Sequence, residues 1–128
     1  MNFSFITKQQ KPKRDHEHKL QCACVRWFRL QHPDIATLMF AVPNGGRRDP
    51  ITGARLKEEG VVAGVADLIL LVPNNKHHAL LIELKTPRGR QSASQRTWQE
   101  TAEKHGYKYV VCRDAQQFVA QVQQYLND

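Results

Sequence analysis

The sequence predicts one α/β domain in which a mixed β-sheet is flanked by helices. Two apolar runs of strand length, "ADLILLV" (66–72) and "ALLIELK" (79–85), lie in the middle of the chain. Both are rich in Leu and Ile at successive positions, as in strands that are covered on both faces. Segments with helical spacing of apolar residues precede and follow them. The length of 128 residues fits a single domain with its own core.

The first part of the chain predicts an arm followed by a long helix. Residues 1–14 are polar and basic without periodicity, so we expect a flexible basic arm, with the folded domain spanning 15–128. Asp15 is a suitable N-cap for a helix that ends near Gln31, before Pro33. The apolar stripe of this helix is Leu20, Cys24, Trp27 and Phe28.

The central part predicts strands on either side of a loop and a short helix. "ATLMFAV" (36–42) is typical of a strand, and "PNGGRRDPITG" (43–53) of a loop with a turn at Asn44-Gly45. "ARLKEE" (54–59) predicts a short helix that Gly60 ends. The turn residues "PNNKHH" between the two apolar runs predict that these runs form an antiparallel hairpin.

The C-terminal part predicts a helix, a strand and a last helix. The helix spans about 93–105 and ends at Gly106, the strand is "YKYVVC" (107–112), and the last helix is "AQQFVAQVQQYL" (115–126). A strand, a helix and a second strand in succession form a β-α-β unit, so the strands at 79–85 and 107–112 should be parallel neighbours.

The charge of the chain predicts a polyanionic partner. Lys and Arg number 19 against 12 acidic residues, a net charge of +7. A solvated surface that is merely positive explains this composition equally well, but the basic groups cluster where loops are expected, at Arg47 and Arg48 and at Arg88 and Arg90. A nucleic acid is therefore favoured as the partner over a membrane. The apolar runs are too short to span a bilayer. Three cysteines and a start without a secretory signal predict a cytoplasmic location.

Three charged residues end the apolar runs of the hairpin: Asp67, Glu83 and Lys85. If the turn is centred on Asn75 or Lys76, residue 67 faces 83 or 85 on the neighbouring strand. Side chains alternate along a strand, so Glu83 and Lys85 share a face, and opposed residues share a face too. We therefore expect the three side chains to meet at one end of the hairpin.

A divalent cation explains why two carboxylates lie together in an apolar segment. Burying them without a partner costs several kcal/mol per ion. Hard oxygen ligands on rigid strands, with positions open to water and phosphate, are what Mg²⁺ prefers. The Lys85 ammonium beside such a metal would orient a water and offset charge at phosphorus. The alternative is a salt bridge of Lys85 with one carboxylate at a strand end.

Five motifs resemble those of a known family in their order along the chain. "NGGRRD", "RLKEEGVVAGVADLIL", "LLIELK", "GRQSASQRTWQE" and "GYKYVVC" are similar to the virus-type replication–repair nuclease (VRR-NUC) domain, a branch of the PD-(D/E)XK nuclease superfamily, over about 16–126. The resemblance implies the PD-(D/E)XK fold and a phosphodiester hydrolase that uses Mg²⁺ or Mn²⁺. One departure is Ala66, where the superfamily has a proline that shapes the strand entry.

The resemblance also implies roles for individual residues. Asp67, Glu83 and the main-chain carbonyl of Leu84 would hold the metal, and Lys85 would position the attacking water. Glu17 matches the acidic residue of the family's first helix, a further metal or water ligand, and Gln95 matches a glutamine on the helix after the lysine strand. The arginines in loops would contact phosphates without reading bases: Arg47, Arg48, Arg88 and Arg90.

The substrate implied by the resemblance is branched DNA, including four-way junctions, cut by a homodimer. Alternatives are a non-catalytic DNA-binding module on a nuclease fold, or a flap-type or restriction-type nuclease. Other features have structural explanations as well: Ser92-x-x-Gln95 is a capping box, and Glu17 lies in the first turn of a helix, where an acid is favourable. His18 and Cys22 have zinc-ligand spacing, but no second pair completes a tetrahedral set.

Overall fold

The computed structural model describes residues 13–43 and 50–128, so most of the predicted arm and both Arg47 and Arg48 lie outside the described residues. Along the chain the elements are α2 (Lys13–Gln31), the 3-10 helix η1 (Pro33–Leu38), β1 (Met39–Ala41), α3 (Pro50–Glu58), β2 (Leu68–Leu70), β3 (Leu80–Leu84), α4 (Ala93–Lys104), β4 (Lys108–Cys112) and α5 (Ala115–Asn127).

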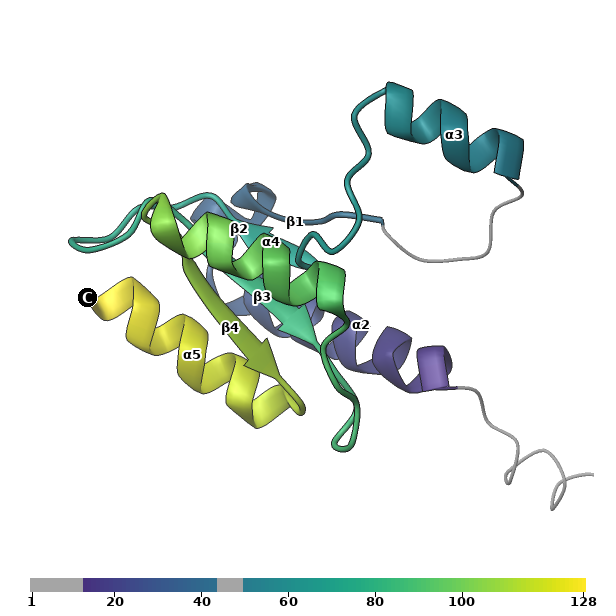
Figure 1. The fold of residues 1–128 in the computed structure, drawn as a ribbon. Helices are drawn as coiled ribbons and strands as arrows, with labels where there is room; N and C mark the ends of the chain where they lie inside the picture. Colours follow the sequence, from purple (N-terminus) through teal and green to yellow (C-terminus); the bar gives the residue numbers. More distant parts are fainter. Residues whose placement is uncertain (1–12, 44–49) are drawn as a thin grey trace, which may run out of the picture.

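The strands of the described residues form one mixed sheet in the order β1-β2-β3-β4 (Figure 1). β2 pairs antiparallel with both β1 and β3, whereas β3 and β4 are parallel. The predicted hairpin and the predicted β-α-β unit are both confirmed. In the hairpin Leu68 lies opposite Ile82, and continuing this register by one residue puts Asp67 opposite Glu83.

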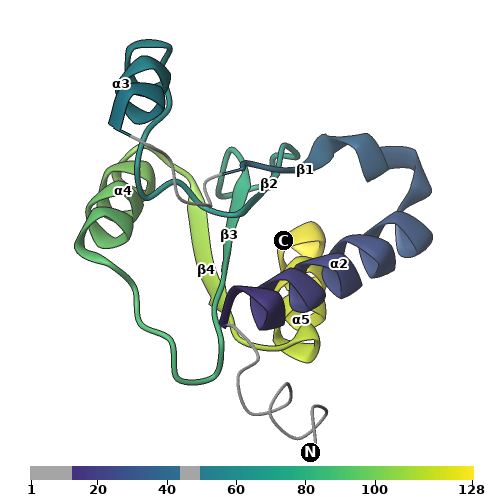
Figure 2. The same cartoon turned by 90° about the vertical axis from the view of Figure 1, so that its right-hand side faces the viewer.

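Helices cover both faces of the sheet. Figure 2 shows α4 on one side and α2 with α5 on the other. The larger core lies under α2 and α5 and contains Phe28, Leu68, Ile82 and Phe118, all fully buried. The smaller core, under α4, is built around Leu81 and Tyr109. Because both faces are covered, every residue of β3 is buried, as its unbroken apolar run predicts.

Several element boundaries differ from the sequence prediction, and the strands β2, β3 and β4 are shorter than their predicted runs. α2 begins at Lys13, so Asp15 lies in its first turn and is not the N-cap, and the helix includes the end of the predicted arm. The segment before β1 is a 3-10 helix with Pro33 at its start, which shortens the predicted strand. α3 begins at Pro50 within the predicted loop, because proline fits the first turn of a helix.

The helix α3 stands away from the sheet in both views (Figures 1 and 2). None of its described residues is buried. It ends before Gly60, whose φ of 103° is in the left-handed region that favours glycine, as predicted. Among the helices of residues 13–43 and 50–128, none combines the length and the apolar content needed to cross a bilayer.

Candidate active site

Glu83 is the one charged residue among the buried residues described, with 1% of its surface exposed. It occupies the fourth position of β3, where the strand is covered on both faces. Its Oε1 accepts hydrogen bonds from the Tyr109 hydroxyl on β4 and from Gln91 Nε2, at 3.1 Å, in the loop before α4. Gln91 is itself held, because its Nε2 also donates to Gln99 Oε1 at 2.8 Å. One oxygen of the carboxylate is therefore fixed by two donors from separate segments.

The other oxygen of Glu83 has no such partner. Among the described residues, Oε2 of Glu83 is the buried side-chain oxygen or nitrogen left without a hydrogen bond. Lys85 Nζ lies 3.7 Å away, close enough for an ion pair but too far for a hydrogen bond. A buried carboxylate oxygen without a donor is costly. An added cation would satisfy it, so the donor set fits the divalent metal that the sequence predicts.

Asp67 lies at the end of β2, beside the end of β3. Its Oδ2 accepts a hydrogen bond of 2.7 Å from the backbone N–H of Leu84. Burial raises the pKa of Asp67 most, and the Leu84 N–H opposes this. The nearby carboxylates of Glu83 and Glu17 raise the same pKa further, while Lys85 lowers it. Like charges therefore gather here, as expected where a cation is bound.

The backbone of β3 also faces Asp67. The N–H and C=O of one residue in a strand point to the same neighbouring strand. Because the Leu84 N–H bonds Asp67 Oδ2, the Leu84 carbonyl is directed to that side as well. The next residue, Lys85, has its N–H bonded to the Cys112 carbonyl of β4 at 3.0 Å, which fixes the backbone from which the ammonium extends.

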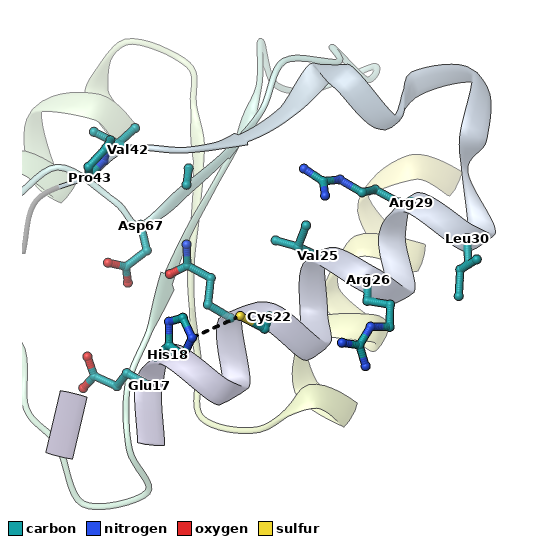
Figure 3. A pocket seen from close by; sticks show the side chains of 12 residues that line it. Glu17, His18, Cys22, Val25, Arg26, Arg29, Leu30, Val42, Pro43 and Asp67 are labelled. Atoms are coloured by element: carbon teal, nitrogen blue, oxygen red, sulfur yellow. Dashed lines mark hydrogen bonds between the residues drawn. The ribbon is translucent and has the colours of Figure 1, made fainter. Parts of the chain in front are cut away.

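Glu17 faces this site from α2 across a cavity of about 720 Å³. Figure 3 shows its carboxylate and that of Asp67 pointing into the same end of the cavity. Within the described ranges, no group of three or more His, Cys, Asp or Glu side chains is close enough to hold a metal ion. Glu17 thus faces Asp67 across the cavity without forming such a group with it, and His18 contacts Cys22 Sγ at 3.6 Å.

Gln95 forms the predicted capping box at the start of α4. Its N–H donates to Ser92 Oγ, and its Oε1 accepts from the Ser92 N–H at 2.8 Å. Gly64 packs against this helix start, since a Cβ on Gly64 would lie 2.4 Å from the Ser94 carbonyl oxygen. The segment that leads to Asp67 is therefore seated on the capped end of α4, which gives Gln95 a structural role near the site.

The loop between β3 and α4 presents Arg88 and Arg90, both exposed. Its shape is held by Arg113, which follows β4 and donates from Nη1 to the carbonyls of Thr86, at 2.8 Å, and Gly89, at 2.7 Å. The sequence prediction did not include Arg113. The same loop supplies Gln91 to Glu83, so Arg113 stabilises the position of a site residue as well.

The sequence prediction also missed Tyr109 and Gln91. Glu83 pairs with Val111 on the neighbouring parallel strand. Tyr109 lies two residues before Val111, so its side chain is on the same face of the sheet as Glu83. This register was the signal that could have identified Tyr109, once β3 and β4 were paired. Gln91 has no comparable signal, because a loop residue has no period.

Comparisons with known proteins give one consistent result. The family model of the VRR-NUC domain matches residues 9–116. The fold is similar to a solved structure described as a VRR_NUC domain protein, with a TM-score of 0.76 and 25% sequence identity over 87% of this chain and 88% of that chain. No curated protein matches this chain.

Proposed function

This chain belongs to the VRR-NUC family of nuclease-type domains, and we propose that it is a divalent-metal-dependent endonuclease of branched DNA. In this proposal it hydrolyses phosphodiester bonds with Mg²⁺ or Mn²⁺ as cofactor. The observation that carries the proposal is Glu83, a buried carboxylate with one oxygen held by two donors and the other left open beside Lys85.

The residues that would hold the metal lie on two adjacent strands. Glu83 Oε2 and the carboxylate of Asp67 supply hard anionic oxygens, and the Leu84 carbonyl supplies a neutral one. Glu17 would reach the same region through water from across the cavity. When bound, the metal would polarise the scissile phosphate and lower the pKa of a water molecule.

The remaining residues would orient the reactants. Lys85 is largely buried, with 13% of its side chain exposed, and its ammonium would position the attacking water and offset charge at the phosphate. Gln95 would support this end of the site through the helix cap. Arg88 and Arg90 would bind flanking phosphates from their loop, as would Arg47 and Arg48.

A homodimer is the form we propose for cutting a four-way junction. A junction is resolved by two cuts on opposed strands, and the chain carries one Asp67–Glu83–Lys85 site. A two-fold dimer would present two such sites and would double the net charge of +7 that meets the DNA. Its affinity should therefore fall steeply with salt concentration.

The test is cleavage of labelled linear, flap and four-way DNA by the purified protein with Mg²⁺, Mn²⁺ or EDTA. We expect metal-dependent cutting of the four-way DNA, and a dimer by light scattering at micromolar concentration. Lys85→Ala should retain metal binding and lose turnover. If the protein is a monomer that only nicks a plasmid cruciform, the proposed substrate is a flap or a single-strand branch and not a four-way junction. Binding without cleavage under every metal condition would leave a non-catalytic DNA-binding module.

A further inference from the structure

The cavity that Asp67 and Glu17 share continues along α2 as a groove between that helix and the end of β1 (Figure 3). Its near end holds the carboxylates of Asp67 and Glu17, at the edge of the candidate active site. Its far end is lined by Arg26 and Arg29, one turn apart on α2, both exposed. The groove thus has two carboxylates at one end, which would bind a cation, and two guanidiniums at the other end, which would bind anions.

The guanidiniums of Arg26 and Arg29 are accessible to a ligand, since both side chains are exposed. Within residues 13–43 and 50–128, neither guanidinium has an ion pair or a hydrogen bond. In Figure 3 the Arg29 side chain extends from α2 toward the strand on the other side of the groove. The walls between the charged ends are largely apolar, from Val25, Val42 and Pro43. An extended ligand with anionic groups and apolar surface matches this lining.

The length of the groove fits several nucleotides. Residues 17 and 29 are separated by about 18 Å along a helix that rises about 1.5 Å per residue. The phosphates of one DNA strand follow each other about every 3.4 Å along the duplex axis. A strand whose scissile phosphate lies at the end of the groove marked by Asp67 and Glu17 would therefore place a phosphate near Arg26 or Arg29 about four to five nucleotides away.

We propose that this groove binds the sugar–phosphate backbone of the DNA segment adjoining the cleaved bond, with Arg26 and Arg29 pairing with its phosphates. The inference rests on the proposed nuclease function and adds to it the path of the substrate strand. Guanidiniums that pair with phosphates position a strand without reading its bases, so we expect the groove to bind DNA independently of sequence.

The experiment compares two double variants with the same change in charge. Arg26→Ala/Arg29→Ala removes the two arginines from the groove. Lys104→Ala/Lys108→Ala removes two exposed lysines at the opposite end of the sheet, where β4 begins beside the start of β3. Both are made in the Glu83→Gln background so that DNA is not cut, and circular dichroism melting checks that they fold. Binding of labelled four-way DNA is measured by fluorescence anisotropy between 50 and 200 mM salt (roughly the range over which phosphate contacts are lost).

The groove variant should bind about 10-fold more weakly, and its slope of log K against log salt should fall by about 1 to 2, one for each lost phosphate contact. The lysine variant should change little in slope. A second comparison uses four-way DNA in which only the cut strand is shortened, to end about two nucleotides beyond the cleavage position on its 5′ side or on its 3′ side, while the other strands keep their full length. The shortened side is too short to reach the arginines by the spacing above. The shorter DNA should bind more weakly to the parent protein and to the lysine variant. Its affinity for the groove variant should be almost the same as that of the full-length DNA.

Equal losses in the two double variants would show that net charge alone matters and would overturn the proposal. An undiminished response of the groove variant to trimming would overturn it as well. This outcome can be distinguished from a failure of the nuclease proposal. If the wild-type protein never cleaves, but DNA binding depends on Arg26, Arg29 and DNA length as predicted, the groove proposal stands and the nuclease proposal is wrong. If the wild-type protein cleaves DNA but its binding shows no such dependence, the nuclease proposal stands and the groove proposal is wrong.

Discussion

The two ends of the β2–β3 hairpin both contain partly or fully buried polar side chains, but they satisfy them differently. At the turn end, Asn74 Oδ1 accepts from the N–H groups of Lys76 and His77, and its Nδ2 donates to the Tyr125 carbonyl at 3.0 Å. The Tyr125 hydroxyl in turn donates to the Val72 carbonyl at 2.6 Å. At the opposite end, Glu83 uses one oxygen in the same way and leaves the other without a donor.

This difference indicates that one end of the hairpin is built for stability and the other for binding a ligand. Asn74 and Tyr125 form a closed network that ties the turn to α5, and every partner belongs to the chain. The network of Glu83 is open at the atom that faces Lys85 and the Asp67 side of the sheet. An open position in an otherwise satisfied buried network is destabilising unless a ligand completes it. The predictions that follow test whether a metal does so.

The largest effect is expected for Glu83→Gln, which removes the open anionic oxygen and keeps the shape of the side chain. Cleavage should fall on the order of 10⁴-fold or more, as for residues that act on the reacting atoms. The heat of Mn²⁺ binding in calorimetry should disappear, while DNA binding and the circular dichroism spectrum remain. Cleavage near the wild-type rate would remove Glu83 from the site.

Tyr109→Phe should have the next largest effect, because it frees the oxygen of Glu83 that the hydroxyl holds. A carboxylate that is no longer oriented should bind Mn²⁺ about 10- to 100-fold more weakly, the usual range for a residue that positions a metal ligand. Calorimetric titration measures this directly. Tyr107→Phe is the matched control, since Tyr107 is exposed and its ring contacts His78. Equal metal affinity in the two variants would mean that Glu83 needs no such support.

Asn74→Ala tests the closed end. It removes the acceptor of two backbone N–H groups and the donor to Tyr125, so unfolding in urea should require about 1–3 kcal/mol less free energy. Metal affinity and the rate per folded molecule should not change. Asn75→Ala is the control, because the described residues provide no hydrogen bond to its exposed side chain. A loss of metal binding in Asn74→Ala would show that the two ends of the hairpin are coupled.

The sequence predicts the open end of this hairpin better than it predicts the groups around it. The period of two and the position of the turn limited the residue opposite Asp67 to 83 or 85 in advance, and the register of the hairpin selects Glu83. The capping box of Ser92 and Gln95 was equally readable, since it depends on four consecutive residues.

Contacts between distant segments could not be predicted in this way. The bond of Tyr109 to Glu83 spans 26 residues and depends on the register of two parallel strands. The contacts of Arg113 with the loop after β3 depend on the path of that loop. The start of α3 was missed because turn residues were weighed above the preference of proline for a first helical turn. Distance along the chain limited the prediction of Tyr109 and Arg113, whereas the start of α3 was missed through its local residues.

The smallest expected change is in metal-free stability, where Asp67→Asn should give a pH-dependent gain. Burial and the carboxylates of Glu83 and Glu17 raise the pKa of Asp67, so the folded protein holds this proton more tightly than the unfolded chain. Stability therefore falls as the pH rises from the ordinary aspartate pKa, near about 3.9, through the raised value, and the deficit persists at neutral pH. Asn cannot ionise, and its side-chain oxygen still accepts from the Leu84 N–H.

In EDTA, chemical denaturation should therefore show Asp67→Asn to be more stable than wild type at pH 7, with the two converging near pH 3 (roughly one unit below the ordinary aspartate pKa). Saturating Mg²⁺ should reverse the order, because it stabilises only the protein that binds it. Asp34→Asn, with its exposed carboxyl on η1 away from the proposed metal site, is the matched control and should not show the reversal by Mg²⁺. A less stable Asp67→Asn at pH 7 in EDTA would mean that the ionised carboxylate is already well solvated or paired. The repulsion that a metal is proposed to relieve would then be absent, and the open end of the hairpin would be no less satisfied than the closed one.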